Sequence, residues 1–293
     1  MQLHLVDATY ELFRSFYAPR PRTSAPDGRD VGAVVGLMYT LLALLRDEGA
    51  THVGCATDHV IRSFRNDLYD GYKTDAGVPR ELLAQFPLAE RAMEALGVVV
   101  WPMAEFEADD ALATAANRWA GASGVDRVII CTPDKDLAQC VRGETVVMLD
   151  RRRNNTIDEA GVAAHWGVRP GSIPDYLALV GDSADGFPGL PGWGAKSAAA
   201  VLARFEHLET IPENVADWHV DVRSAGQLNA TLRDRWSEAQ LFRHLATLAT
   251  DAPLPQRNPD DLLWRGAPRR EFTALCAELG QPRLAERPHL WQD

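Results

Sequence analysis

The sequence predicts an α/β protein with a mostly parallel central sheet flanked by helices, and three observations favour this fold class. Short apolar runs alternate along the chain with longer helical stretches, which is typical of strand–helix–strand units. Several of these runs end on, or just before, an acidic residue. The 293 residues, 46% of them hydrophobic and 24% charged, suit one large domain or a core with a smaller second domain.

Five apolar runs are predicted to be strands. They comprise residues 3–6, 52–57, 98–101, 127–132 and, less strongly, 145–149. Between the first two, an exposed loop over 18–30 precedes a strongly apolar helix over 32–46. Acidic residues lie at or shortly after the ends of the first four runs. Because ligand sites of parallel sheets form outside the carboxyl ends of the strands, we expect these acids to share one pocket.

The densest acidic stretch comprises residues 105–110 and leads into an alanine- and leucine-rich helix. Glu107 and Asp110 are three residues apart and project from the same side of that helix. Acids are favoured in any first helical turn, so compensation of the helix macrodipole is the plainer interpretation of this stretch alone. Further acids later in the chain favour a metal pocket instead. Asp134 and Asp136 point the same way if their segment is extended.

Beyond residue 153 the chain changes to shorter helices and turns. A Gly/Pro hairpin within 187–198 runs into an alanine-rich helix. Its glycines Gly192 and Gly194 allow backbone N–H groups to approach a phosphate, and Lys196 and the helix N-terminus add positive potential. We prefer this phosphate-binding interpretation to a plain helix–turn–helix connection because the three residues occur together. The rest of the chain is helical and charged, without a chemical motif.

The net charge of −11 argues weakly against nucleic-acid binding, since phosphates attract positive charge. Net charge does not show where the charges lie, and acids that converge on divalent ions are partly neutralised by them. The four cysteines have no metal-type or redox-type spacing, and Cys55 and Cys131 fit buried thiols. No targeting segment or apolar run of membrane-spanning length is found, so we expect a cytoplasmic protein with no membrane contact.

The order of these motifs resembles the flap endonuclease/5′-3′ exonuclease family, especially the 5′-nuclease domain of bacterial DNA polymerase I, here in free-standing form. The matching segments are Leu5-Val6-Asp7 with Arg14, Asp58 with Phe64-Arg65, Tyr72-Lys73, and residues 107–110, 134–136, 181–185 and 188–196. The resemblance implies a PIN-like nuclease core over 1–167 with a helical arch at about 61–91. It also implies a helical C-terminal region over 168–293, with a helix–three-turn–helix at about 174–205.

The resemblance implies a metal-dependent nuclease that cuts DNA at 5′ single-strand/duplex junctions and removes nucleotides from 5′ ends. Two or more Mg²⁺ or Mn²⁺ ions fit such an acidic pocket, because both ions prefer oxygen ligands and crowded carboxylates repel one another without cations. Carried over residue by residue, the metal-pocket acids are Asp7, Asp58, Glu107, Asp109, Asp110, Asp134, Asp136, Asp182 and Asp185.

The resemblance also assigns residues to the DNA. Arg14, Arg65 and Lys73 would hold the scissile phosphate, and Tyr72 would stack on a base of the frayed 5′ end. A solvated amphipathic helix is the plainer interpretation of this group. The residues that would grip the duplex backbone are Gly189, Gly192, Gly194 and Lys196, with K⁺ on the hairpin carbonyls as a further candidate. The implied partner is DNA with a 5′ flap, 5′ overhang or nick, bound by a monomer.

The sequence departs from the family pattern in several places. Residues 74–77 lack a second basic residue of the arch, and Pro133 and Gly186 stand where relatives carry Gly and Asn. Trp193 in the hairpin is either a DNA-facing aromatic or part of local packing. Two alternatives remain. A catalytically inactive DNA-junction binding protein is disfavoured by the complete acid set, and a PIN-like ribonuclease is disfavoured by the helix–three-turn–helix.

Overall fold

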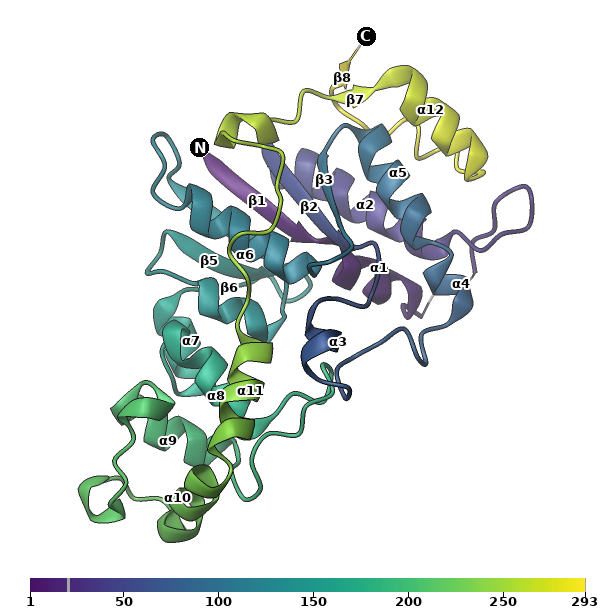
Figure 1. The fold of residues 1–293 in the computed structure, drawn as a ribbon. Coiled ribbons are helices and arrows are strands. Elements are labelled where there is room, and N and C mark those ends of the chain that lie inside the picture. The colour runs from purple at the N-terminus through teal and green to yellow at the C-terminus, as the bar shows by residue number, and fades with distance from the viewer. Residues whose placement is uncertain (20–21, 293) are drawn as a thin grey trace. The chain divides into compact units, whose positions relative to one another are not determined.

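The computed structural model describes residues 1–19 and 22–292 and contains two compact units (Figure 1). Unit 1 consists of Met1–Ile61, Asp75–Thr132 and Thr250–Asp293. Unit 2 consists of Arg62–Thr74 and Pro133–Ala249. Each unit is therefore assembled from segments that are far apart in the sequence.

Unit 1 is built on four parallel strands in the order β3-β2-β1-β4. These strands are β1 (Gln2–Asp7), β2 (His52–Asp58), β3 (Val99–Met103) and β4 (Arg127–Cys131). Val6 pairs with Cys55 on one side and with Cys131 on the other, so the carboxyl ends of the three strands lie at one edge. β1 and β2 are almost entirely buried, as expected for parallel strands covered on both faces. The four strands predicted for this part of the chain are confirmed.

Helices cover both faces of these strands (Figure 1). The helices of unit 1 are α1 (Ala8–Phe16), α2 (Gly32–Arg46), α4 (Arg80–Leu83), α5 (Phe86–Leu96), α6 (Ala108–Trp119) and α12 (Arg269–Glu278). The main helix contacts with the strands are made by α1, α5 and α6, whereas α12 packs on α5. α6 packs across all four strands, while α2 packs against α1 and α5. The predicted apolar helix over 32–46 coincides with α2, whose many buried aliphatic side chains explain its location in the interior. The α/β class with a mostly parallel sheet is confirmed.

The C-terminal part of unit 1 returns to the sheet layer. It contains the short helix η5 (Pro259–Leu262), α12 and the strand pair β7 (Ala267–Pro268) and β8 (Trp291–Gln292). Trp264 fastens this segment, because its backbone N–H donates to the Thr51 carbonyl at 2.8 Å and its indole N–H to the Leu96 carbonyl at 2.8 Å. Burial of the indole with both donors satisfied stabilises this attachment.

Unit 2 is mostly helical. Its elements are α3 (Arg65–Leu68), η1 (Lys135–Cys140), the antiparallel hairpin β5 (Val146–Asp150) and β6 (Asn155–Ile157), α7 (Glu159–Trp166), η2 (Pro170–Ser172), α8 (Ile173–Val180), α9 (Ala195–Phe205), η3 (Leu208–Thr210), η4 (Val215–Asp217), α10 (Ala225–Asp234) and α11 (Trp236–Ala246). α8 is central and packs against α9 and α11. The predicted short helices near 162–167 and 174–180 and the helix after the hairpin are all present.

The segment over 61–91 is less helical than the predicted arch. Before α5, it holds only the four-residue helices α3 and α4 among its residues, all of which the structure describes. Two glycines interrupt it: Gly77 has φ 88°, and a Cβ on Gly71 would lie 2.6 Å from the Tyr69 ring. The positive φ of Gly77 favours glycine and interrupts a helix, and the Tyr69 ring leaves no room for a side chain at Gly71.

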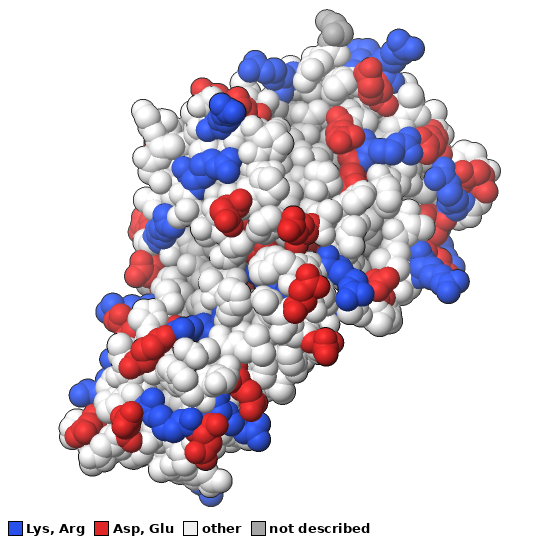
Figure 2. Space-filling model, viewed as in Figure 1, with Lys and Arg blue, Asp and Glu red and all other residues white. Residues whose placement is uncertain are grey.

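Acidic and basic side chains are interspersed over the face of the molecule shown in Figure 2. Figure 2 shows no broad basic surface on this face, in keeping with the net charge of −11. Across the described ranges, no helix combines the length and the apolar character that a bilayer-spanning segment needs.

Candidate metal centres and nucleic-acid interface

Two carboxylates of unit 1 stand at the ends of neighbouring strands. Asp7 ends β1 and caps α1: its Oδ1 accepts the Tyr10 N–H at 2.8 Å, and its Oδ2 accepts the Thr132 hydroxyl at 2.9 Å. Asp58 ends β2, and its Oδ1 accepts the Ala108 N–H at 2.7 Å. Because β1 and β2 run in parallel register, both acids lie at the carboxyl edge of the sheet.

Three further acids lie at the start of α6, directly after β3. Glu107 and Asp110 form a capping box, in which Asp110 Oδ2 accepts the Glu107 N–H at 2.9 Å. Both side chains are buried, and Asp110 is 0% exposed, whereas Asp109 is half-buried. Capping therefore explains part of this cluster. Capping does not exclude metal binding, because a carboxylate has a second oxygen and further lone pairs that could bind a metal ion.

Unit 2 holds the tightest acid group among the described residues. Asp136, Asp182 and Asp185 each offer one oxygen within 4.8 Å of the others, and all three are buried. Asp136 Oδ1 is buried without a hydrogen-bond partner in the structure. A buried carboxylate oxygen that lacks a donor is costly, and a divalent cation would supply the missing charge. The donor set of three hard oxygens fits Mg²⁺ or Mn²⁺.

Burial and mutual repulsion act on the acids of this group. Burial raises the pKa of Asp136 well above its ordinary value, and the nearby carboxylates of Asp134 and Asp185 raise it further. Desolvation also raises the pKa of Asp134. Asp134 keeps contact with solvent, whereas Asp136 is buried, so burial acts most strongly on Asp136. Without a metal, burial therefore disfavours the ionised form of Asp136.

Asp134 and Asp136 do not lie on one extended segment, which was the condition under which their side chains would point the same way. The chain turns into the 3-10 helix η1 directly after Asp134, whose carboxylate accepts the Asp136 N–H at 3.0 Å. A short acid that bonds the backbone two residues ahead favours such a turn over an extended strand. As a result, Asp134 faces solvent and Asp136 is buried.

Two lysines approach the buried acids of unit 2. Lys73 Nζ lies 2.9 Å from Asp185 Oδ1. Lys135 Nζ forms an ion pair with Asp182 and lies 3.9 Å from Asp136 Oδ1. Burial works against the charge of Lys135, but the carboxylates of Asp136 and Asp182 outweigh it and raise the pKa of the lysine. Lys135 was not singled out from the sequence, where it stands simply between two acids.

Two residues that were expected to contact DNA are buried instead. Tyr72 is 3% exposed, and its hydroxyl donates to Asp185 Oδ2 at 3.2 Å, so no ring face is available to a base. Arg65 is 1% exposed, and its guanidinium donates to the carbonyls of Leu245 at 2.8 Å and Thr247 at 3.1 Å. These contacts make both residues part of the framework of unit 2, and their stacking and phosphate roles stay predictions.

Arg14, the third predicted phosphate ligand, lies on α1 in unit 1 and is partly exposed. Its Nε donates to Glu11 at 2.8 Å, and its guanidinium also donates to the Thr40 hydroxyl at 2.9 Å. These contacts hold the side chain about two turns along the helix from Asp7. Arg14 therefore keeps an exposed surface that a phosphate could approach.

The hairpin between α8 and α9 is shaped by its glycines. Gly189 has φ 69°, and a Cβ there would lie 2.3 Å from the Gly181 backbone nitrogen, so only glycine fits. Trp193 is buried and donates its indole N–H to the Leu228 carbonyl at 3.1 Å. Trp193 therefore serves local packing, and the DNA-facing alternative does not apply. Gly186 also admits no side chain, since a Cβ would lie 2.2 Å from the Gly71 carbonyl oxygen.

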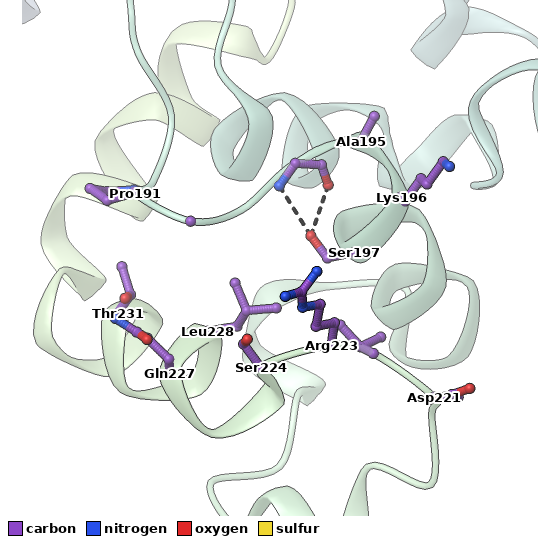
Figure 3. Close-up of a pocket in the computed structure, with 13 residues that line it drawn as sticks. Pro191, Ala195, Lys196, Ser197, Asp221, Arg223, Ser224, Gln227, Leu228 and Thr231 are labelled. Atoms are coloured by element: carbon purple, nitrogen blue, oxygen red, sulfur yellow. Dashed lines mark hydrogen bonds between the residues drawn. The ribbon is translucent and has the colours of Figure 1, made fainter.

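A groove of about 730 Å³ lies between this hairpin and α10 (Figure 3). Ser197 lies on its wall, where its hydroxyl bonds the N–H and the carbonyl of Gly194, each at 3.0 Å. In Figure 3 the side chain of Lys196 points away from the groove, while Arg223 reaches toward Ser197. Arg223 and Gln227 also line the groove. The sequence did not single them out, because they lie in the charged C-terminal part that carries no motif.

Unit 1 has carboxylates at the carboxyl edge of a parallel sheet, where such folds form ligand sites, and unit 2 holds a buried carboxylate group that could bind a divalent ion. The chain belongs to the 5′-3′ exonuclease family. The family's N-terminal resolvase-like domain matches residues 2–167, and its C-terminal SAM-fold domain matches residues 168–270. The predicted family resemblance is thereby confirmed.

Curated relatives are DNA polymerase I proteins. The chain is 38% identical over 260 residues to that of Rhizobium leguminosarum, which covers 86% of this chain and 25% of the relative. It is 31% identical over 290 residues to that of Bacillus subtilis, with 98% and 32% covered. The chain thus spans about a quarter to a third of the length of these relatives.

Solved structures share the fold. A bacteriophage T5 flap endonuclease in complex with DNA and metal ions superposes with a TM-score of 0.67 at 17% identity, covering 98% of this chain and 100% of that one. The catalytic core of Rad2 in complex with DNA substrate superposes with a TM-score of 0.60 at 15% identity, covering 98% and 90%. At these identities the likeness establishes the fold alone.

Proposed function

We propose that this protein is a structure-specific 5′-nuclease that hydrolyses DNA phosphodiesters with divalent metal ions. It acts as a flap endonuclease and 5′-3′ exonuclease at 5′ single-strand/duplex junctions. The observation that carries this proposal is the buried group Asp136, Asp182 and Asp185, whose oxygens converge within 4.8 Å in a chain of the 5′-3′ exonuclease family. A protein that only bound DNA would gain nothing from three carboxylates that burial and repulsion disfavour.

The metal ions are Mg²⁺ or Mn²⁺, and each unit contributes its own set of acids. In unit 2, Asp136, Asp182 and Asp185 hold an ion directly, and the exposed Asp134 assists from the start of η1. The acids proposed for unit 1 are Asp7, Asp58, Glu107, Asp109 and Asp110. When bound, such ions activate a water and neutralise charge on the leaving oxygen.

Basic side chains and the hairpin bind the DNA. Lys73 and Arg14 position and neutralise the scissile phosphate. Gly189, Gly192, Gly194 and Lys196 hold the duplex backbone, with a K⁺ ion on the hairpin carbonyls. The partners are DNAs with a 5′ flap, 5′ overhang or nick, bound by a monomer in the cytoplasm during replication and repair. A division into a nuclease core over 1–167 and a helical region over 168–293 belongs to the same proposal.

A catalytically inactive junction-binding protein is the second candidate. One observation favours it: Tyr72 and Arg65 are buried, and the exposed position Ala76 carries no cation, so fewer side chains reach the substrate than in the family pattern. The intact acid set argues for the enzyme. A PIN-like ribonuclease is less compatible with the SAM-fold match over 168–270.

Cleavage of matched substrates separates these functions. Wild-type protein is mixed with an end-labelled 5′-flap duplex, the same duplex without a flap, and an RNA flap, each with Mg²⁺, Mn²⁺ or EDTA. We expect metal-dependent cutting near the DNA junction and shortening from the 5′ end. Tight binding of the flap without cutting under any metal would favour the inactive binder, and preferential cutting of RNA would favour the ribonuclease.

A further inference from the structure

Lysine is scarce in this chain, and its placement is selective. Of the 30 basic residues only Lys73, Lys135 and Lys196 are lysines, and the others are arginines. Two of the three lysines contact the buried acids of unit 2, and the third is exposed on α9. Arginine holds a carboxylate through a rigid, bidentate fork, whereas an ammonium is a compact charge on a flexible stem. Lysine therefore suits a position where a cation must be released.

The two ammonium groups lie where a metal ion would be needed. Lys135 Nζ contacts Asp182 Oδ2 and lies 3.9 Å from Asp136 Oδ1, so it spans two of the three acids. Lys73 Nζ covers the third, at 2.9 Å from Asp185 Oδ1. Together they neutralise part of a buried negative cluster that would otherwise repel itself. The side chain of Lys135 is about one-third exposed, so it has a route into solvent.

Lys135 is the freer of the two lysines. Lys73 is also anchored through its backbone. Its backbone N–H donates to the Asp185 carbonyl at 2.9 Å, and the Lys73 carbonyl accepts a hydrogen bond from Asn66 Nδ2 at 2.9 Å. Its ammonium also lies 5.7 Å from the centre of the Tyr72 ring. The Lys135 ammonium pairs with Asp182 and lies 3.9 Å from Asp136 Oδ1, and both acids are ones that a metal ion would use.

We propose that Lys135 is a built-in counter-cation, which pairs with Asp182 and Asp136 in the metal-free protein and is displaced when a divalent ion binds. This inference rests on the proposed metal role of the acid group. A positive charge at these distances repels an incoming divalent ion and also competes for its ligands. Lys135 thus keeps the empty site folded and raises the metal concentration needed to fill it.

The test is the affinity for Mn²⁺ alone, measured by isothermal titration calorimetry on the full chain. Lys135→Met removes the charge and keeps the apolar stem, and Lys196→Met is the matched control on an exposed helix position. We expect Lys135→Met to bind Mn²⁺ roughly 10-fold more tightly than wild type, because the competing cation is gone. Its metal-free Tm should fall and its Tm rise on adding Mn²⁺ should increase, while Lys196→Met matches wild type in both.

A second variant keeps the inference testable if Lys135→Met does not fold. Lys135→Arg retains the charge and adds a bidentate grip, so we expect Mn²⁺ binding several-fold weaker than wild type. Wild-type affinity in both variants, or weaker binding by Lys135→Met, would overturn the counter-cation role while leaving the nuclease proposal standing. Absence of Mn²⁺ binding in wild type and both variants would instead overturn the metal site itself, and the inference with it.

Discussion

Asp136 is the residue at which burial and charge act together most strongly. It is enclosed, its Oδ1 lacks a hydrogen-bond partner, and burial raises its pKa. A carboxyl whose pKa is higher in the folded state binds its proton more tightly there than in the unfolded chain. Its contribution to stability is fully present below the unfolded value of about 4 and is lost as pH rises through the folded value.

The raised pKa of Asp136 in the folded state gives a prediction for the stability of the metal-free protein. In EDTA, Asp136→Asn should be more stable than wild type at pH 8, by on the order of 1–3 kcal/mol, and the gain should shrink toward pH 4. Thermal unfolding across that pH range measures the difference. Asp217→Asn, which changes an exposed acid of the same unit, should track wild type. A variant that is less stable than wild type at pH 8 would show that the ionised carboxylate stabilises the fold.

Arg65 gives a second prediction at this scale, because its contacts are structural. Arg65→Met leaves the carbonyls of Leu245 and Thr247 without their guanidinium donor, and we expect a loss of about 2–4 kcal/mol in the free energy of unfolding. Urea denaturation measures this loss, with the exposed Arg62→Met as control. Unchanged stability combined with a selective loss of DNA cleavage would restore the phosphate role.

Among the elements, the hairpin before α9 depends most on backbone conformation. Gly189→Ala should destabilise the protein by roughly 2–3 kcal/mol, because φ 69° disfavours a side chain and its Cβ would meet the backbone of Gly181. Gly194→Ala should lower the Tm much less, since Gly194 has φ −136°, no atom lies within 4 Å of its Cβ position, and only the N-cap preference for glycine is lost. Equal Tm values for the two variants would contradict this account of the hairpin.

The helices, strands and turns also show which features could be predicted from sequence patterns. The strand and helix positions could be predicted because apolar runs and capping acids are local signals, as at β1 with Asp7 and at α6 with Glu107. The 3-10 turn after Asp134 forms because a side chain caps the backbone there, and the loop around Gly71 follows from the close approach of the Tyr69 ring. The spacing of residues in the sequence does not show whether such local contacts will win over an extended backbone. The burial of Arg65 could not be predicted, because its partners lie about 180 residues away along the chain.

At the scale of the whole molecule, the net charge of −11 must be reconciled with the polyanionic substrate that we propose. Divalent ions at the acid sets would remove much of the local repulsion. We therefore expect a 5′-flap DNA to bind roughly 10-fold more tightly with Ca²⁺ than with EDTA, at constant ionic strength. Fluorescence anisotropy measures both affinities. Equal affinities would mean that metal ions bound to the acids do not contribute to DNA binding.

Residues 250–292 belong to unit 1 although the middle of the chain forms unit 2, and the sequence did not predict this. That segment is held by contacts such as the Trp264 N–H to the Thr51 carbonyl, which join distant parts of the chain without a recognisable motif. By contrast, the family resemblance could be predicted because it depends on several short motifs in a fixed order, and their order is visible in the sequence itself.

The central claim is that buried carboxylates make this protein a metal-dependent 5′-nuclease, and single-turnover cleavage of a 5′-flap duplex tests it most directly. Wild type, Asp136→Asn and the exposed control Asp217→Asn are compared in Mg²⁺ and in EDTA. We predict cleavage near the junction by wild type and Asp217→Asn in Mg²⁺ only, and a rate lower by roughly 100-fold or more for Asp136→Asn. Cleavage by Asp136→Asn at the wild-type rate, or cleavage that persists in EDTA, would contradict the claim.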